Sequence, residues 1–225
     1  MIEIRNVVKT YCTGTSAEVR ALKGINLAVH NGEMIAVMGV SGSGKSTLLH
    51  IIGCLDKPTE GDYILDGTNI KDCKASELYK IRNEKIGFIL QDYGLIEDKT
   101  VLENVMYPLA FSKNVKFTKM KKQALQAIAQ VGIADLSRKK VSKLSGGQKQ
   151  RAAAARAIVN NPGIILADEP TAALDTKTAD EIMGLLKALN QRGTTVIVVT
   201  HDKRIAEMCG KTYIISDGLI EEEKK

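Results

Sequence analysis

The 225-residue sequence contains no tryptophan, and aromatic residues make up only 4% of it. Readers of single-stranded nucleic acid commonly stack bases on aromatic side chains, so this composition argues against such a protein. Long hydrophobic runs are also missing: the strongest ones, which begin at Ile164 and Val196, are four residues long. About 20 apolar residues are needed to cross a bilayer, so we expect any membrane span to come from another chain.

Cysteine patterning is absent as well. The sequence has four cysteines, at positions 12, 54, 73 and 209, and none forms a C-x-x-C pair. Neither a zinc site nor a disulfide framework is therefore indicated. Near the N-terminus, Glu3, Arg5 and Lys9 lie where a signal peptide would have its apolar segment. We expect reduced thiols and a cytosolic protein.

The excess of positive over negative charge lies in one segment. The net charge is +6, but residues 71–143 hold 15 Lys and Arg against 8 Asp and Glu, and the rest of the chain is close to neutral. One hypothesis is a positive face toward an anionic inner leaflet or an acidic partner loop; a solvated lysine-rich surface is the alternative. The residues of this hypothesis are Lys113, Lys116, Lys119, Lys121, Lys122, Arg138, Lys139 and Lys140.

The hydrophobic pattern divides the chain into three parts. Residues 1–70 read as short strands with turn signals; the Asn31-Gly32 pair predicts a hairpin between the strands on either side of it. Residues 71–143 read as an inserted helical subdomain. Residues 144–225 return to alternating helices and strands, with a last hairpin at Asp217-Gly218 and a polar tail, EEEKK, that we expect to be frayed. We predict one α/β domain whose body comprises residues 1–70 and 144–225, with an antiparallel β subdomain at its N-terminus.

A phosphate-binding motif interrupts the early strands. Residues 39–46, GVSGSGKS, match G-x-x-x-x-G-K-[ST] and lie between an apolar strand and a segment with helical spacing, which is the context that the motif needs. The glycines let backbone N–H groups turn toward phosphates, Lys45 can reach the β- and γ-phosphates, and Ser46 can ligate Mg²⁺.

Two further motifs complete a nucleotide-hydrolysis pattern. The apolar run Ile164–Ala167 delivers the adjacent carboxylates Asp168 and Glu169, of which one can hold a metal while the other polarises water. The segment LSGGQ, residues 144–148, opens a helical stretch with Ser145 as a natural N-cap. Because one phosphate loop is already a full cradle, a second anion-binding helix start suggests a nucleotide held by a second copy of the protein.

Together with Ala173-Leu174-Asp175 and Thr200-His201-Asp202, these motifs resemble, in order and spacing, those of ABC-transporter ATPase subunits, over essentially the whole chain. The segments VRALKGINLAV, LLHIIGCLDKPTEG and IGFILQ are similar to the group that energises lipoprotein-release, macrolide-export and antimicrobial-peptide-resistance transporters. The resemblance implies a P-loop NTPase core that hydrolyses ATP with Mg²⁺.

The resemblance also implies roles for individual residues. Asp175 would line the subunit interface, and Ala172 replaces the usual Ser or Gly there. The implied catalytic residues are Lys45, Gln91, Glu169 and His201, and the implied Mg²⁺ ligands are Ser46, Gln91 and Asp168. The implied ATP contacts are Tyr11, which would stack on adenine, and Gly39, Ser41, Gly42, Ser43, Gly44, Lys45, Ser46, Thr47, Ser145, Gly147 and Gln148.

The implied partners are a second copy, joined head to tail in the presence of ATP, and an integral-membrane permease that holds the protein at the inner face of the membrane. In such a dimer Ser145 and Gly147 of one copy would contact the nucleotide gripped by Lys45 of the other. The resemblance points to export or extraction of a peptide antibiotic, macrolide or lipoprotein. Two alternatives are a small kinase, which has no use for LSGGQ, and a nucleic-acid-linked or translation-associated ABC ATPase, which usually carries two cassettes or a long insertion.

Overall fold

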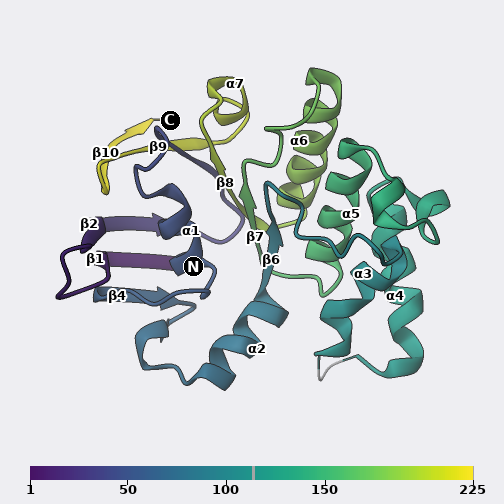
Figure 1. Cartoon of the computed structure of the whole chain (residues 1–225), viewed down its shortest axis with the longest axis horizontal. Coiled ribbons are helices and arrows are strands. Elements are labelled where there is room, and N and C mark those ends of the chain that lie inside the picture. The colour runs from purple at the N-terminus through teal and green to yellow at the C-terminus, as the bar shows by residue number, and fades with distance from the viewer. Residues whose placement is uncertain (113–114, 225) are drawn as a thin grey trace.

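Two β-sheets form the frame of the molecule (Figure 1). This computed structural model describes residues 1–112 and 115–224. The antiparallel sheet has the order β2-β1-β4-β5 and the core sheet the order β10-β9-β3-β8-β7-β6. Their strands span Ile2–Tyr11 (β1), Val19–Val29 (β2), Met34–Met38 (β3), Glu60–Leu65 (β4), Thr68–Asn69 (β5), Ile86–Ile89 (β6), Ile164–Asp168 (β7), Thr195–Thr200 (β8), Lys211–Ser216 (β9) and Leu219–Lys224 (β10).

The strands β3, β8, β7 and β6 of the core sheet run parallel. They are continuous apolar runs, and every residue of β8 is buried, as expected for strands covered on both faces. Parallel strands all end at the same edge of a sheet. The residues that follow β3, β6, β7 and β8 therefore meet at one edge, and this edge carries the candidate site.

One helix joins the two sheets into a common core. The helix α1 (Lys45–Ile52) follows β3 and buries Leu48, Leu49, Ile51 and Ile52. These side chains share a cluster with buried residues of both sheets, and burying each of them contributes roughly 1.5–3 kcal/mol. The N-terminus of α1 is thereby held rigidly at the end of β3.

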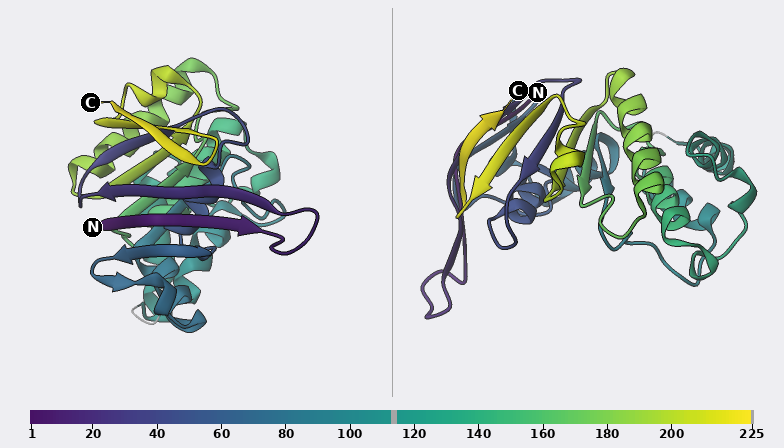
Figure 2. Two further views of the ribbon diagram at one scale, coloured as in Figure 1. Left: turned by 90° about the vertical axis from the view of Figure 1, so that its left-hand side faces the viewer. Right: turned by 90° about the horizontal axis from the view of Figure 1, so that it is seen from above.

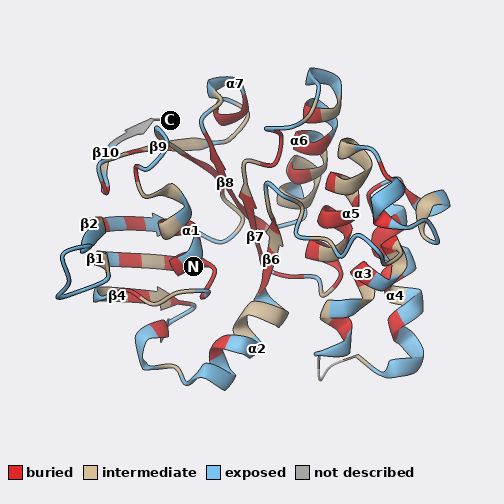
Figure 3. Cartoon of the chain, in the orientation of Figure 1, coloured by how far each residue is buried: buried red, intermediate tan, exposed pale blue. Residues whose placement is uncertain are grey.

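The remaining helices lie mostly on the other side of the core sheet and form a second apolar cluster with it. Seen from above, the antiparallel sheet lies at one end of the molecule and α3 and α4 at the other (Figure 2). The central strands β3, β8 and β7 of the core sheet are buried between them (Figure 3). In the described part of the chain, no helix combines the length and apolarity needed for a membrane span. The helices span Ala75–Lys85 (α2), Val101–Ala110 (α3), Phe117–Gln130 (α4), Gly146–Ile158 (α5), Thr176–Gln191 (α6) and Lys203–Ala206 (α7), with 3-10 turns at Ile70–Asp72, Ala134–Leu136 and Val141–Lys143.

The prediction of a hairpin at Asn31-Gly32 is wrong. The strand before this pair, β2, lies in the antiparallel sheet, and the strand after it, β3, lies in the core sheet. Gly32 has a φ of 79°, and its N–H donates to Thr195 Oγ1 at 2.9 Å. The turn is therefore a crossing between sheets. Its cause is tertiary, because β3 is apolar on both faces and takes a central position, whereas β2 alternates.

Two other predictions about the chain's organisation also differ from the structure. The segment 71–143 was expected to form a helical insertion that also holds the strand IGFIL before Gln91. Ile86–Ile89 do form this strand, β6, but it belongs to the core sheet, where it pairs with β7. The final residues were expected to be a frayed tail, but Glu222 and Glu223 continue β10 and pair with Ile214 and Tyr213. At the end of the chain, backbone pairing with β9 across the hairpin outweighs local polarity. The predicted hairpin at Asp217-Gly218 connects β9 and β10.

The basic residues of the segment 71–143 form two groups. Lys113 lies outside the described residues; Lys116, Lys119, Lys121 and Lys122 are exposed at the start of α4. Arg138, Lys139 and Lys140 are exposed beyond the other end of this helix, where the Lys139 carbonyl accepts from the Val101 N–H. Fourteen residues of helix span about 20 Å. The single positive face of the hypothesis is therefore split along the length of α4.

Candidate functional site

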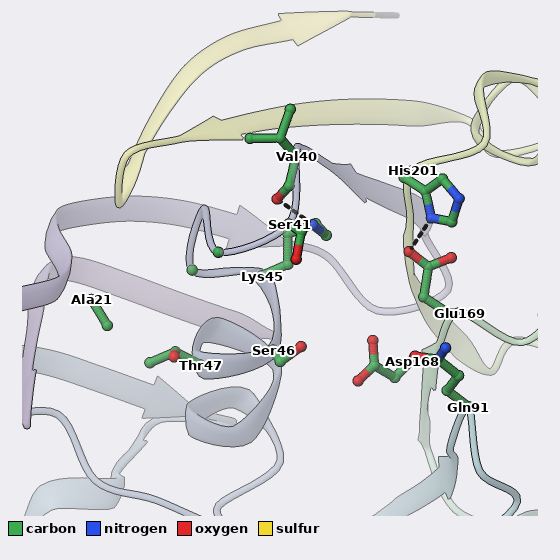
Figure 4. Close-up of a pocket in the computed structure, with 12 residues that line it drawn as sticks. Ala21, Val40, Ser41, Lys45, Ser46, Thr47, Gln91, Asp168, Glu169 and His201 are labelled. Atoms are coloured by element: carbon green, nitrogen blue, oxygen red, sulfur yellow. Dashed lines mark hydrogen bonds and ion pairs between the residues drawn. The ribbon is translucent and has the colours of Figure 1, made fainter. Parts of the chain in front are cut away.

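A cleft of about 680 Å³ opens at the carboxyl edge of the core sheet (Figure 4). The loop after β3 and the first turn of α1 form one wall, and the residues that follow β6, β7 and β8 form the other. Most of the residues predicted to bind nucleotide or to catalyse its hydrolysis meet here. The lining comprises Ala21, Val40, Ser41, Gly42, Gly44, Lys45, Ser46, Thr47, Gln91, Asp168, Glu169 and His201.

The glycine-rich loop has a shape that only glycine permits at two positions. A Cβ on Gly39 would lie 2.2 Å from the Ile215 carbonyl oxygen, and Gly44 has a φ of 105°. Gly44 is also the N-cap of α1, so no side chain caps this helix and its first N–H groups remain open to an anion. The Lys45 ammonium donates to the carbonyls of Gly39 at 2.8 Å and Val40 at 2.7 Å. The loop is thus preformed for phosphate.

Ser43 supports this loop from inside. Its side chain is buried, and its Oγ lies 2.6 Å from the position of a Cβ on Gly39. This Oγ has no hydrogen-bond partner among the described residues. Neither Ser43 nor Gly39 lines the cleft, so the structure gives both a part in shaping the loop.

The opposite wall carries oxygen ligands suited to a hard cation. Burial raises the pKa of Asp168, and the Glu169 carboxylate raises it further, whereas a hydrogen bond with Ser46 lowers it. Gln91, which follows β6, lines the same part of the cleft as Asp168 (Figure 4). Among the described residues no group of three His, Cys, Asp or Glu could hold a metal alone. The side-chain oxygens of Ser46, Asp168 and Gln91 all line the cleft and fit Mg²⁺, which is bound through a few protein oxygens together with phosphate and water.

Glu169 is held in a strained and oriented position. Its φ is +45°, outside the usual range for a side-chain-bearing residue, and such strain is typical of functional sites. The Glu169 N–H donates to the Val199 carbonyl at 2.9 Å, and its Oε1 lies 2.7 Å from His201 Nδ1. Thr200 Oγ1 donates to Oε2 at 3.3 Å. The Glu169 side chain is only 12% exposed. These hydrogen bonds hold its carboxylate in the wall of the cleft.

Tyr11 lies beside the cleft rather than in its lining. Its hydroxyl donates to Asp56 Oδ2 at 3.0 Å, and the Lys9 ammonium lies 4.9 Å from the ring centroid. Burial raises the Tyr11 pKa, and a hydrogen bond with Thr47 of the cleft wall lowers it. One face of the ring is therefore covered by a cation, and stacking on adenine stays a prediction for the other face.

The start of α5 lies outside the cleft. Ser145, Gly147 and Gln148 are absent from its lining. Ser145 Oγ accepts from the Gln148 N–H at 3.4 Å, and Gln148 Oε1 accepts from the Ser145 N–H at 3.1 Å, which is a capping box. Asp175 caps α6 by accepting from the Thr178 N–H at 3.0 Å. Within one copy, these residues do not reach the phosphate loop.

Sequence reasoning missed two residues of the cleft. Val40 lies inside the phosphate motif at a position that the motif leaves open, so the motif could have indicated it. Ala21 belongs to β2 and lines the cleft beside the N-terminus of α1, where its carbonyl oxygen lies 2.7 Å from the position of a Cβ on Gly44. No sequence signal marks Ala21, because its place depends on the packing of two distant elements.

A second hollow, a groove of about 380 Å³, lies between α2 and the end of α3. Its rim exposes Leu55, Tyr79 and Phe111. The rings of Tyr79 and Phe111 meet edge to face at 6.2 Å. On its inner side Arg156 of α5 lines the groove. Exposed large apolar side chains around a groove are typical of a protein-docking site.

Comparisons with known proteins agree on one family. The family model described as ABC transporter matches residues 22–172. Over 100% of its length the chain is 48% identical to ABC transporter ATP-binding protein MJ0796 of Methanocaldococcus jannaschii, covering 97% of that protein. It is also 49% identical to YvrO of Bacillus subtilis, with coverage of 97% of the chain and 94% of YvrO.

Longer relatives and solved structures are similar as well. The chain is 44% identical to the macrolide export ATP-binding/permease protein MacB of Bdellovibrio bacteriovorus, but it spans only 34% of that protein. Its fold matches the dimeric structure of a post-hydrolysis state of the MJ0796 cassette bound to ADP and Pi. The TM-score is 0.92 at 47% identity, with coverage of 100% of the chain and 98% of the other chain.

Proposed function

The chain belongs to the ABC transporter family, and from this membership we propose that two copies of it share two Mg-ATP sites and drive a membrane permease. The family predicted from the sequence motifs is confirmed, and the chain is an ATP-binding and ATP-hydrolysing cassette. The shared site is supported by the positions of the motifs within one copy. The cleft holds the phosphate loop and the carboxylates, whereas Ser145 and Gly147 lie outside it.

In the proposed mechanism the Lys45 ammonium leaves its two loop carbonyls for the β- and γ-phosphates, and the first N–H groups of α1 bind the same oxygens. Mg²⁺, held by Ser46, Asp168 and Gln91, would neutralise charge on the phosphates. Glu169 accepts a proton from the attacking water, and its hydrogen bonds to His201 and Thr200 orient it for this task. Water bonds to the γ-phosphorus as the bond to the bridging oxygen breaks, which releases ADP and phosphate.

A second copy would complete each site. The start of α5 presents N–H groups and the Ser145 hydroxyl, and its two glycines let a phosphate approach the backbone. The γ-phosphate would then be bound in the closed dimer and lost after hydrolysis. A ligand shifts an equilibrium only through such a difference in affinity between two states, so ATP would close the dimer and hydrolysis would open it.

The groove between α2 and α3 is the proposed docking site for the permease. Its exposed Leu55, Tyr79 and Phe111 suit the apolar face of a short cytoplasmic helix. Arg156 lines the groove and donates to the Tyr93 carbonyl, two residues after Gln91, so this side chain would connect a docked helix with the cleft. We place the chain at the inner face of the membrane through this contact, and the exposed lysines at the start of α4 would add attraction to anionic lipid.

Export is the proposed direction of transport, because MacB relatives join a similar cassette to a permease for macrolides. The cargo would be a macrolide, a peptide antibiotic or a lipoprotein, selected by the permease. The nucleic-acid-linked alternative is not favoured. It predicts ATPase stimulation by nucleic acid and no partner captured from detergent-solubilised membranes, whereas the transporter predicts a captured permease and no such stimulation.

The substitution Glu169→Gln tests the shared site. It keeps the shape of the side chain but removes the proton acceptor, so we expect hydrolysis to fall by a factor of about 10²–10⁴ while ATP binding persists. Light scattering on the eluted protein should then show a dimer at saturating Mg-ATP. Glu181→Gln, at an exposed position of α6 that pairs with Arg151, is the matched control. Elution of the Glu169 variant as a monomer would contradict the shared site.

A further inference from the structure

One short segment, residues 91–94, connects the cleft with a residue that lines the groove. Gln91 lines the cleft, and three residues later the chain turns against α5. Tyr93 and Gly94 have consecutive positive φ values of 64° and 56°. The left-handed conformation of Tyr93 costs roughly 1–2 kcal/mol, so surrounding contacts must hold this turn in place.

Arg156 supplies these contacts. Its guanidinium donates to the Tyr93 carbonyl at 2.9 Å and also to the Gly94 carbonyl. Burial lowers the Arg156 pKa, while the charge of Asp92 acts in the opposite direction. In the described part of the chain no carboxylate forms an ion pair with Arg156. A half-buried cation is thus bound to two backbone oxygens of this turn.

There is little free space around the Tyr93–Gly94 turn. A Cβ on Gly94 would lie 3.3 Å from Arg156 Nη2 and 3.2 Å from Leu90 Cδ1. The Tyr93 hydroxyl reaches the other end of the same helix, since a Cβ on Gly146 would lie 3.1 Å from it. The turn therefore rests on α5 at two places, near Gly146 beside the Ser145 cap and at Arg156 in the last turn.

We propose that Arg156 is a positioning residue for ATP hydrolysis. By bonding both carbonyls of the Tyr93–Gly94 turn, it holds the preceding Gln91 in the cleft beside Asp168 and Glu169. The inference rests on the proposed role of Gln91 in hydrolysis. Because Arg156 also forms part of the groove wall, a helix docked in the groove acts on the same side chain that holds Gln91.

The test compares steady-state ATPase kinetics of the unsubstituted chain with those of Arg156→Met, which keeps the apolar stem but loses the donors. We expect kcat to fall about tenfold, because charged hydrogen bonds to the turn are lost, and KM for ATP to change less than twofold, since Lys45 and its loop are untouched. Arg156→Lys, which keeps one donor direction, should recover part of kcat. Fluorescent-nucleotide binding and thermal unfolding verify that each variant is folded.

A double-mutant cycle with Gln91→Ala separates positioning from general destabilisation. If Arg156 acts through Gln91, adding Arg156→Met to Gln91→Ala lowers kcat by less than a further twofold, whereas independent effects multiply. The control is Arg151→Met on the same helix, which loses bonds to the Val131 carbonyl and Glu181 but does not touch the turn. Its kcat should stay within twofold of the wild type.

The outcomes are distinguishable. An unchanged kcat in Gln91→Ala contradicts the proposed role of Gln91 itself. A reduced kcat in Gln91→Ala together with an unchanged kcat in Arg156→Met overturns the positioning role alone. Multiplicative losses in the double variant, or a raised KM at constant kcat, overturn it as well.

Discussion

A methyl group added at Gly147 distinguishes packing within one copy from contact between two copies. The Cβ of Gly147→Ala would lie 2.6 Å from Thr178 Cγ2, about 1 Å inside the usual carbon–carbon contact distance. Overpacking of this kind costs roughly 1–3 kcal/mol, and replacing glycine by alanine in a helix offsets about 1 kcal/mol of that. We therefore expect the free energy of unfolding to fall by about 1 kcal/mol, which lowers Tm by about 2–4 °C.

The second substitution Thr178→Ser removes the clashing methyl group and keeps the hydroxyl that donates to Asp175 Oδ2 at 2.6 Å. The double variant Gly147→Ala/Thr178→Ser should regain a free energy of unfolding within about 0.5 kcal/mol of the wild type. Its ATPase activity should nevertheless stay at least about tenfold below the wild type, because in the proposed shared site the new methyl group would hinder the approach of the partner's nucleotide to the α5 backbone.

The assay measures thermal unfolding and ATP hydrolysis on the same preparations. Thr178→Ser alone should keep both near the wild-type values. Gly184→Ala is the control for helix propensity, because nothing lies within 4 Å of its added Cβ; it should raise stability and spare activity. Recovery of ATPase in the double variant would refute the reasoning, since Gly147 would then serve only the packing against Thr178.

Three further predictions concern the cleft and the charged helix. The pKa of Asp168 is raised, so its ionisation is less favourable in the folded than in the unfolded state. This residue therefore lowers the free energy of unfolding as pH rises from the ordinary aspartate range through the raised pKa. Asp168→Asn should therefore raise Tm at neutral pH while abolishing Mg²⁺-dependent hydrolysis, and an unchanged Tm would contradict this. Tyr11→Phe should keep ATP affinity within twofold and Tyr11→Ala should weaken it about tenfold in equilibrium binding; equal affinities would remove the stacking role. Replacing the basic side chains at the start of α4 with glutamine should weaken cosedimentation with anionic vesicles, by about 1 kcal/mol per residue, without changing ATPase; unchanged sedimentation would favour a solvated surface. The residues to replace are Lys116, Lys119, Lys121 and Lys122.

The sequence by itself predicted those features that depend on consecutive residues. The phosphate loop is determined locally, because its glycines and Lys45 act through backbone shape and reach within eight residues. The same holds for the turn at Asp217-Gly218, where φ values of 46° and 77° suit this pair, and for Ser145 as the cap of α5. Asp168 and Glu169 were predictable because an apolar strand directly precedes them.

Only the tertiary structure decided which distant segments pair. Asn31-Gly32 joins two sheets, and β6 enters the core sheet, because apolar strands gain most where both faces are covered. Hydrogen bonds between distant segments decide two further features. Arg156 donates to the Tyr93 carbonyl, 63 residues away, and the strained Glu169 donates its N–H to the Val199 carbonyl. Each of these features depends on burial or hydrogen bonding between segments that are far apart in the chain, and no run of neighbouring residues encodes them.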